Sequence, residues 1–177
     1  MSQLSNEGLI RYLQSLGLAH PTTGRLLAGA LIDPTTVVGA SVQSTDNLLN
    51  SVSLDDEMLA PENRGLVIAA WGTLAANGNT KDLKLKVGST AILTLTDSTA
   101  NAKDYAFIAF LVRDGADSQR GFGIVLVDGA VVAASSINFT ATEDANVAKT
   151  ISTTADNNSA AASAATGKGL VVLPFGG

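Results

Sequence analysis

The stretch Asp82–Val87 reads DLKLKV, and the stretch Tyr105–Val112 reads YAFIAFLV. Side chains of a β-strand alternate between its two faces, so the first stretch predicts a half-exposed strand with Leu83, Leu85 and Val87 inward and its charges outward. The second stretch is apolar on both faces. In an antiparallel sandwich only one face of a strand meets the core, so the other face needs a second cover. We expect this cover to be another part of the chain or another subunit.

Similar strand-like runs follow one another through most of the chain. The residues Asp128-Gly129 lie between two such runs and form the strongest hairpin signal, because both tolerate positive φ. Many short strands at nearly regular spacing predict a mainly β, antiparallel sandwich or jelly-roll-like domain over residues 35–177. The predicted strands are Thr36–Val42, Leu48–Leu54, Gly65–Leu74, Asp82–Val87, Thr90–Thr96, Tyr105–Arg113, Phe122–Val127, Ala130–Ser135, Val147–Thr153 and Gly169–Phe175.

Residues 1–34 follow a helical pattern and form a predicted N-terminal helical arm. Its first helix places four apolar residues on one face: Leu9, Ile10, Leu13 and Leu16. A shorter helix is predicted from Arg25 to Ile32, ended by Asp33-Pro34. Helices this short need a surface on which to pack. The arm either caps the core of its own domain or docks on another subunit.

The composition narrows the range of partners. Only 15% of the residues are charged while 46% are hydrophobic, and the net charge is −5. A surface with so few charges favours contacts between copies of the chain. We expect no nucleic-acid partner, because there is no basic cluster, and no membrane span or signal peptide, because the apolar runs are short. The small, polar segment Ser152–Thr166 is interpreted as an exposed loop, with close packing near a symmetry axis as the alternative.

Residues that could support catalysis are sparse. The single histidine, His20, rules out a multi-histidine metal site, and the absence of cysteine removes thiolate chemistry. The carboxylates at Asp55–Glu57 and Glu62, and those of Asp114 and Asp117, lack the spacing of an EF-hand loop. We therefore expect no catalytic residue, cofactor, metal or small-molecule substrate, and we predict that the protein is not an enzyme.

The stretch Gly72–Gly88 resembles a pattern found in small structural proteins of tailed phages. A strand ends in Gly-Thr, an Ala-Asn-x-Asn-x-Lys turn follows, and an alternating strand ends at Gly. The resemblance extends less specifically over residues 35–177. It implies a β-sandwich component of the virion, often trimeric, used as a head decoration (cement) protein or as a tail or fibre module. In the turn, Asn77, Gly78 and Asn79 can take left-handed conformations, and we expect the Asn side chains to hydrogen-bond nearby backbone groups. Lys81 is then expected to begin the exposed strand.

These observations predict a phage capsid decoration protein that assembles in the cytoplasm of the bacterial host. It would bind the major capsid protein on the outer surface of the head as a homotrimer and stabilise the particle. The predicted contact residues are Leu9, Ile10, Leu13, Leu16, Phe107, Phe110 and Phe122.

Two alternatives remain open. One is a tail or fibre module that recognises a host surface receptor or glycan, with aromatics near Trp71 or Tyr105, although both residues fit core packing better. The other is a carbohydrate-active enzyme, which would need two carboxylates converging in a cleft.

Overall fold

The computed structural model describes residues 31–39, 46–54, 64–115, 118–140, 149–157 and 163–175. These residues contain eleven strands and no helix. The strands are β1 (Leu31–Asp33), β2 (Val37–Val38), β3 (Asn47–Leu54), β4 (Gly65–Leu74), β5 (Lys81–Val87), β6 (Thr90–Ser98), β7 (Asp104–Gly115), β8 (Ser118–Val127), β9 (Ala130–Thr140), β10 (Lys149–Asn157) and β11 (Ala165–Phe175).

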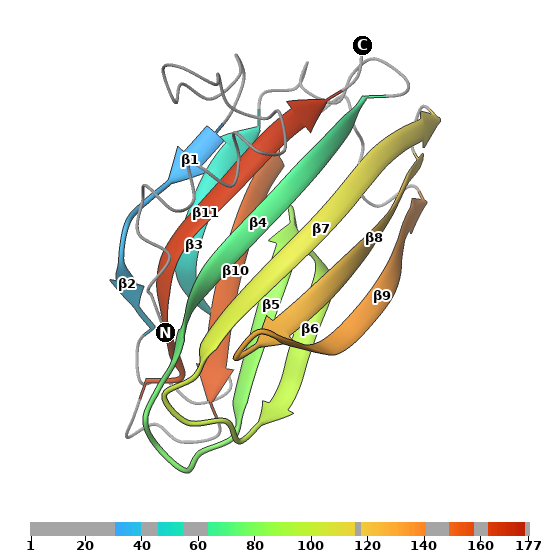
Figure 1. Ribbon diagram of the computed structural model, residues 1–177. Coiled ribbons are helices and arrows are strands. Elements are labelled where there is room, and N and C mark those ends of the chain that lie inside the picture. Colours follow the sequence, from blue (N-terminus) through green and yellow to red (C-terminus); the bar gives the residue numbers. More distant parts are fainter. Residues whose placement is uncertain are drawn as a thin grey trace, which may run out of the picture.

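Two antiparallel sheets face each other. The seven-stranded sheet has the order β1-β11-β4-β7-β8-β9, with β2 also paired to β11, and the four-stranded sheet has the order β3-β10-β5-β6. Figure 1 shows the larger sheet in front of the smaller one. The predicted mainly antiparallel β-sandwich is therefore confirmed. Of the predicted helical arm over residues 1–34, residues 1–30 lie outside the described part of the chain.

The core lies between the two sheets and is filled by alternating strand positions. On β5, Leu83, Leu85 and Val87 are fully buried, as the alternation of DLKLKV predicts. On β7 the inward positions include Phe107 and Leu111, which are also fully buried. Gly123 on β8 has no side chain, and a Cβ there would lie 2.7 Å from Leu93 of β6, so the glycine lets the two sheets approach closely.

The β8–β9 hairpin forms at the predicted turn. Val127 pairs with Ala130, and both residues between them have positive φ, 53° for Asp128 and 82° for Gly129. Two central residues with positive φ give a turn whose twist matches that of the flanking strands. The hairpin prediction is therefore confirmed.

Two local predictions are wrong. Leu31–Asp33 is a strand paired with Leu170–Val172 of β11, so the predicted second helix cannot extend to Ile32. The N-terminal part of the predicted loop Ser152–Thr166 belongs to β10, which pairs with both β3 and β5. Three of its polar residues, Ser152, Thr153 and Thr154, are buried. Small β-branched residues fit a crowded strand, which explains why a low-complexity composition supports a central strand here.

Candidate interaction surface

The outer face of the seven-stranded sheet is apolar over four adjacent strands. Cross-strand register places its residues in three rows that run from β4 through β7 and β8 to β9. The rows are Val67–Phe110–Phe122–Ser136, Ala69–Ile108–Ile124–Ala134 and Trp71–Ala106–Leu126–Val131. We call these three rows the apolar face. Ser136 is the only polar residue in it, and none of its residues is charged.

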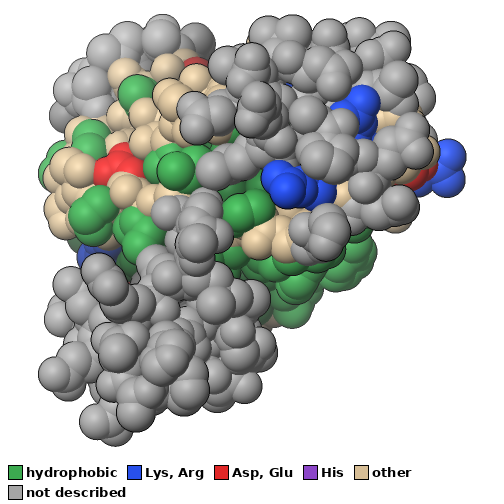
Figure 2. Space-filling view, turned by 90° about the horizontal axis from the view of Figure 1, so that it is seen from above, with side chains coloured by type: hydrophobic (Ala, Val, Ile, Leu, Met, Phe, Trp, Pro, Cys, Tyr) green, Lys and Arg blue, Asp and Glu red, His purple; other side chains and the backbone are tan. Residues whose placement is uncertain are grey.

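Several large side chains of the apolar face are open to solvent. Phe110 is 47% exposed and its directly opposed partner Phe122 is 50% exposed, while Val131 is 59% exposed. Val132, next to Val131 in the chain, is also half exposed. Figure 2 shows hydrophobic side chains gathered in a continuous area along one side of the molecule. A contiguous patch of this kind is typical of a surface that contacts another molecule.

Charged residues lie around the apolar face and not within it. At one end, Arg120 Nε contacts Asp114 Oδ2 at 2.5 Å. At the opposite end, Lys103 Nζ lies 2.7 Å from Asp128 Oδ2, and Lys168 Nζ lies 3.6 Å from Asp104 Oδ1. An apolar centre with a polar, solvated rim is the usual anatomy of a protein–protein interface.

The predicted contact residues separate into three groups. Phe110 and Phe122 lie together on the apolar face. Phe107 does not: it is fully buried and packs edge-on against Tyr105 with ring centroids 5.9 Å apart. Its prediction as a contact residue is wrong, because the face of β7 that carries Phe107 is the one that meets the four-stranded sheet. The remaining four, Leu9, Ile10, Leu13 and Leu16, lie outside the described residues.

The two aromatics considered for a recognition site also differ. Tyr105 is buried, as core packing predicts, and burial raises the pKa of its hydroxyl above the ordinary value of 10.0. Trp71 is only partly buried and belongs to the apolar face. Sequence reasoning did not identify Trp71 or Val131 as members of this surface, because membership depends on the register between strands. No single strand contains that information.

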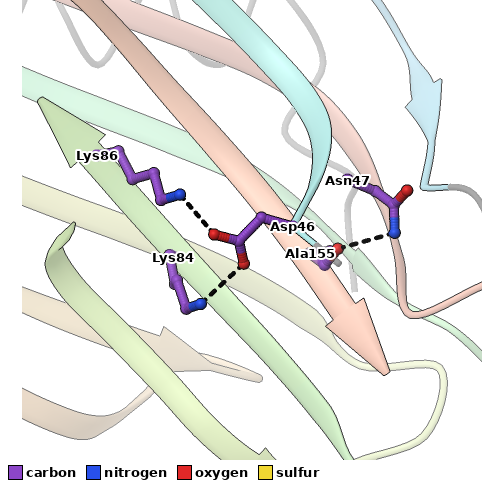
Figure 3. Close-up of polar contacts among 5 residues, drawn as sticks. All are labelled: Asp46, Asn47, Lys84, Lys86 and Ala155. Atoms are coloured by element: carbon purple, nitrogen blue, oxygen red, sulfur yellow. Dashed lines mark hydrogen bonds and ion pairs between the residues drawn. The ribbon is translucent and has the colours of Figure 1, made fainter. Parts of the chain in front are cut away.

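The outer face of the four-stranded sheet has the opposite chemistry. Asp82, Lys84 and Lys86 alternate on β5, and Asp46, just before β3, accepts from both lysines, with distances of 2.8 Å to Lys84 Nζ and 2.5 Å to Lys86 Nζ. Figure 3 shows the two lysines converging on the one carboxylate. Burial alone would raise the pKa of Asp46, but the hydrogen bonds and positive charges of the lysines lower it below 3.8. The hydrogen bond to Asp46 raises the pKa of Lys84.

The turn between β4 and β5 is held by a buried lysine. Lys81 is fully buried, and its Nζ donates to Asn77 O and Asn79 O at 2.9 Å and to Asn101 Oδ1 at 3.2 Å. Burial lowers the pKa of Lys81 below 10.5. Lys81 begins β5, as predicted, but its own side chain is buried and not exposed. Its ammonium group joins the turn to the segment that precedes β7.

The asparagines of this turn act through hydrogen bonds and not through unusual backbone angles. Asn77 Oδ1 accepts from Asn79 N at 3.2 Å, and Asn77 Nδ2 donates to Ser163 O at 3.0 Å. None of the residues predicted to be left-handed has a positive φ. The hydrogen bonds were predicted correctly, and the left-handed conformations were not. These hydrogen bonds hold the turn together and tie it to the segment just before β11.

The described part of the chain offers no site for a metal ion or a membrane-spanning helix. No group of three or more His, Cys, Asp or Glu side chains converges there. Asp114, one of the predicted loop carboxylates, is engaged by Arg120 and by the hydroxyl of Ser118. No helix in the described ranges is long and apolar enough to cross a membrane. The apolar face is therefore the strongest candidate site.

Comparison with known proteins does not assign the chain to a family. No family model and no curated protein matches the chain. Among solved structures, the CBM2 module of the evolved Dit of Lactobacillus casei BL23 phage J-1 has a TM-score of 0.37 and 8% identity, covering 84% of this chain and 90% of the module. Galectin LEC-6 of Caenorhabditis elegans has a TM-score of 0.31 and 9% identity, covering 77% of this chain and 94% of the galectin. At TM-scores below 0.5 these likenesses assign neither a family nor a function.

Proposed function

We propose that the protein is a non-catalytic structural component of a phage particle, a decoration protein that binds the outer surface of the capsid and stabilises the head. The observation that carries this proposal is the apolar face with its charged rim. A surface built in this way gains free energy when it is removed from water against another protein. The resemblance of Gly72–Gly88 to small tailed-phage structural proteins supports the choice of a virion over other assemblies.

The mechanism follows from repetition of many modest contacts. A decoration protein binds where several coat subunits meet, and each copy adds contact area across the seams between them. When the copies are themselves joined into an oligomer, the second and third contacts become intramolecular, and the overall affinity exceeds that of any one contact. In this proposal the copies form a homotrimer, and Phe110 and Phe122 supply the central apolar contacts with the major capsid protein. The helical arm, through Leu9, Ile10, Leu13 and Leu16, supplies a further anchor.

A second candidate is a tail or fibre module that recognises a host receptor or glycan. The observation that favours it is the presence of Trp71, Phe110 and Phe122 on the same outer face. Aromatic rings offer a large, rigid contact area with little loss of conformational entropy. The two candidates make opposite predictions about the binding partner, so one experiment separates them.

The experiment uses the full chain and two variants. The mass of the purified protein is measured in solution, and the protein is then mixed with empty capsids of a tailed phage and sedimented. The face variant Phe110→Lys/Phe122→Lys places two charges in the apolar face. The control variant Ala91→Lys/Thr96→Lys adds the same two charges at exposed positions of β6, on the other sheet.

A decoration protein sediments with the capsids, as does the control variant, while the face variant loses at least tenfold in affinity. Removal of residues 1–20 tests the arm in the same assay. Binding to host cells or their surface glycans, with no binding to capsids, would replace the decoration function with the tail function. Binding to neither, or equal capsid binding by the face and control variants, would overturn the proposal that the apolar face holds the protein on the head.

A further inference from the structure

The two sheets end in edge strands whose outer backbone groups have no partner among the described strands. An edge strand presents a row of N–H and C=O groups that pair readily with another chain, and natural proteins usually protect such edges. Protection takes the form of short strands, charged residues, proline, bulges or a covering segment. In the described part of the molecule the edges are β1 with β2, β3, β6 and β9.

Three of these edges are protected. β1 and β2 contain only 3 and 2 residues. β3 is covered by the segment that joins β1 to β2: Asp33 Oδ2 accepts from Ser51 N at 2.9 Å, and Thr35 O accepts from the side chain of Asn50 at 2.8 Å. β6 has two irregularities in its register with β5, one between Lys81 and Leu83 and one between Leu85 and Lys86.

β9 lacks this protection along most of its length. It has 11 residues, with the sequence AVVAASSINFT, and it contains neither a charged residue nor a proline. Its one irregularity is a bulge at Val132, where the register with β8 shifts between Val125 and Leu126. The bulge lies close to the hairpin turn and leaves Ala133–Thr140 in regular register. Figure 1 shows β9 at the side of the molecule, and no described strand pairs with its outer edge.

We propose that β9 pairs with β9 of a second copy of this chain, in antiparallel orientation, and joins two seven-stranded sheets into one continuous sheet. The backbone groups on the outer side of β9 form a template on which another strand can pair. Within the described chain the other edges are too short, covered or irregular at two places, whereas β9 matches its own length and neutral composition. A twofold axis brings the same surface from both copies together, which is the commonest form of self-association.

This pairing has a geometric consequence for the apolar face. A twofold axis perpendicular to the joined sheet makes the two β9 strands antiparallel and keeps the outer faces of both sheets on the same side. The row that ends at Ala134 and the row that ends at Ser136 then continue into the second copy. Pairing through β9 therefore doubles the extent of the apolar face. The inference goes beyond the proposed function and does not rest on it, since the pairing is independent of the molecule that binds this face.

Pairing through β9 requires copies to associate in even numbers. A trimer held by other contacts would be joined through β9 into a hexamer. The solution mass of the full chain is therefore expected to be an even multiple of 18.0 kDa. A monomer or an isolated trimer at the highest soluble concentration would overturn the inference, although an isolated trimer would leave the proposed decoration function intact.

A pair of lysines in β9 tests the contact itself. Ser135 and Ser136 are both exposed, so the variant Ser135→Lys/Ser136→Lys adds charge to the edge without changing the core. Its mass is expected to be half that of the wild-type protein, while the Ala91→Lys/Thr96→Lys control keeps the wild-type mass. Retention of the wild-type mass by the β9 variant would contradict the pairing. The face variant Phe110→Lys/Phe122→Lys is expected to lose capsid binding and keep the β9 contact, which separates the two proposals.

Hydrogen exchange of the wild-type protein gives a second test that does not depend on any variant. On dilution below the dissociation constant of the pairing, exchange of the amides in residues 133–140 is expected to accelerate at least tenfold, with β4 and β5 unchanged. These strands lie inside their sheets and have partners on both sides. Equal protection of β9 at all concentrations, or acceleration confined to other strands, would reject the pairing.

Discussion

The outer face of the four-stranded sheet carries Asp82, Lys84 and Lys86 on β5, whereas the corresponding face of the seven-stranded sheet carries three apolar rows in which only Ser136 is polar. The inner faces of the two sheets do not differ in this way, because both are filled with buried aliphatic side chains. The hydrophobic core of the sandwich therefore comes from the inner faces. The chemistry of the outer faces is free to serve contacts with other molecules, and only one of them has the composition of a contact surface.

The largest effect is expected from a comparison of the two faces of one strand. Phe107→Ala removes a fully buried ring from β7 and is expected to lower the free energy of unfolding by about 3–5 kcal/mol. Phe110→Ala, three residues away but 47% exposed, is expected to cost less than about 1 kcal/mol in the dissociated protein. Urea denaturation at low protein concentration measures both. Equal losses would show that the apolar face stabilises the fold of the single chain and is not reserved for a partner.

The next largest effect is expected from replacing the buried Lys81, with the partly exposed Lys84 of the same strand as the comparison. Lys81→Met keeps the aliphatic stem but leaves Asn77 O and Asn79 O without their donor, at a cost of about 1–3 kcal/mol. The lowered pKa shows that burial disfavours the ammonium, so removal of the charge offsets part of this loss. Lys84→Met is the control. The side chain of Lys84 is partly exposed, so its replacement is expected to lower the free energy of unfolding by less than about 1 kcal/mol. Thermal unfolding of both variants at pH 7 measures these losses. If Lys81→Met leaves the stability unchanged, the cost of burying the ammonium group cancels the gain from its hydrogen bonds.

The ion pairs of Asp46, on the outer side of the four-stranded sheet, make the stability of the protein depend on pH. Folding lowers the pKa of Asp46 below 3.8, so its contribution to stability is present above that pH and is lost as the pH falls through the folded pKa. Asp46→Asn is expected to lower the free energy of unfolding by about 1 kcal/mol or less at pH 7, because the group is partly solvated. The difference from wild type is expected to shrink as the pH falls below 3.8. Urea midpoints measured from pH 2 to pH 7 test this, and a difference that grows toward acid pH would have the wrong sign.

The smallest effect is expected at the rim of the apolar face. Lys103 and Asp128 form an ion pair whose side chains are 47% and 39% exposed. Such pairs contribute little, so Lys103→Ala is expected to change the free energy of unfolding by less than about 0.5 kcal/mol. Thermal unfolding in low and in moderate salt provides the measurement. A loss as large as that of Asp46→Asn would show that the rim is more rigid than its exposure indicates.

The fold could be predicted where one pattern had one explanation. The alternation of β5 identified a half-exposed strand together with its inward residues, and Asp128-Gly129 identified a hairpin, because each signal is local. The loop predicted around Ser152–Thr154 was wrong because the decisive contacts are not local. The composition of this segment suits a solvated loop, and only pairing with β3 on one side and β5 on the other makes it a buried strand. The burial of Lys81 was not predicted for a similar reason, since one acceptor of its ammonium group, Asn101, lies on another segment.

The sequence identified the strands that form the candidate surface, but not which side of each strand faces outward. Tyr105–Val112 is apolar at every position, so its sequence contains no information about which of Phe107 and Phe110 points inward. The neighbouring strands decide this, because Phe110 lies opposite Val67 and Phe122 in a register set by the whole sheet. A strand with two apolar faces therefore predicts that a second surface exists but not which side chains form it.

The placement of β11 between β1 and β4 has a consequence for synthesis of the protein in the cell. β4 and β11 pair along their full lengths although roughly 100 residues separate them in the chain. At a translation rate of roughly 5–20 residues per second, β4 waits about 5–20 seconds for this neighbour, and contacts of such long range also form slowly after synthesis. During this interval the nascent chain exposes its most apolar strands without the partner that completes the sheet. We therefore expect newly made chains to depend on chaperones for soluble yield more than the stability of the finished sandwich would indicate.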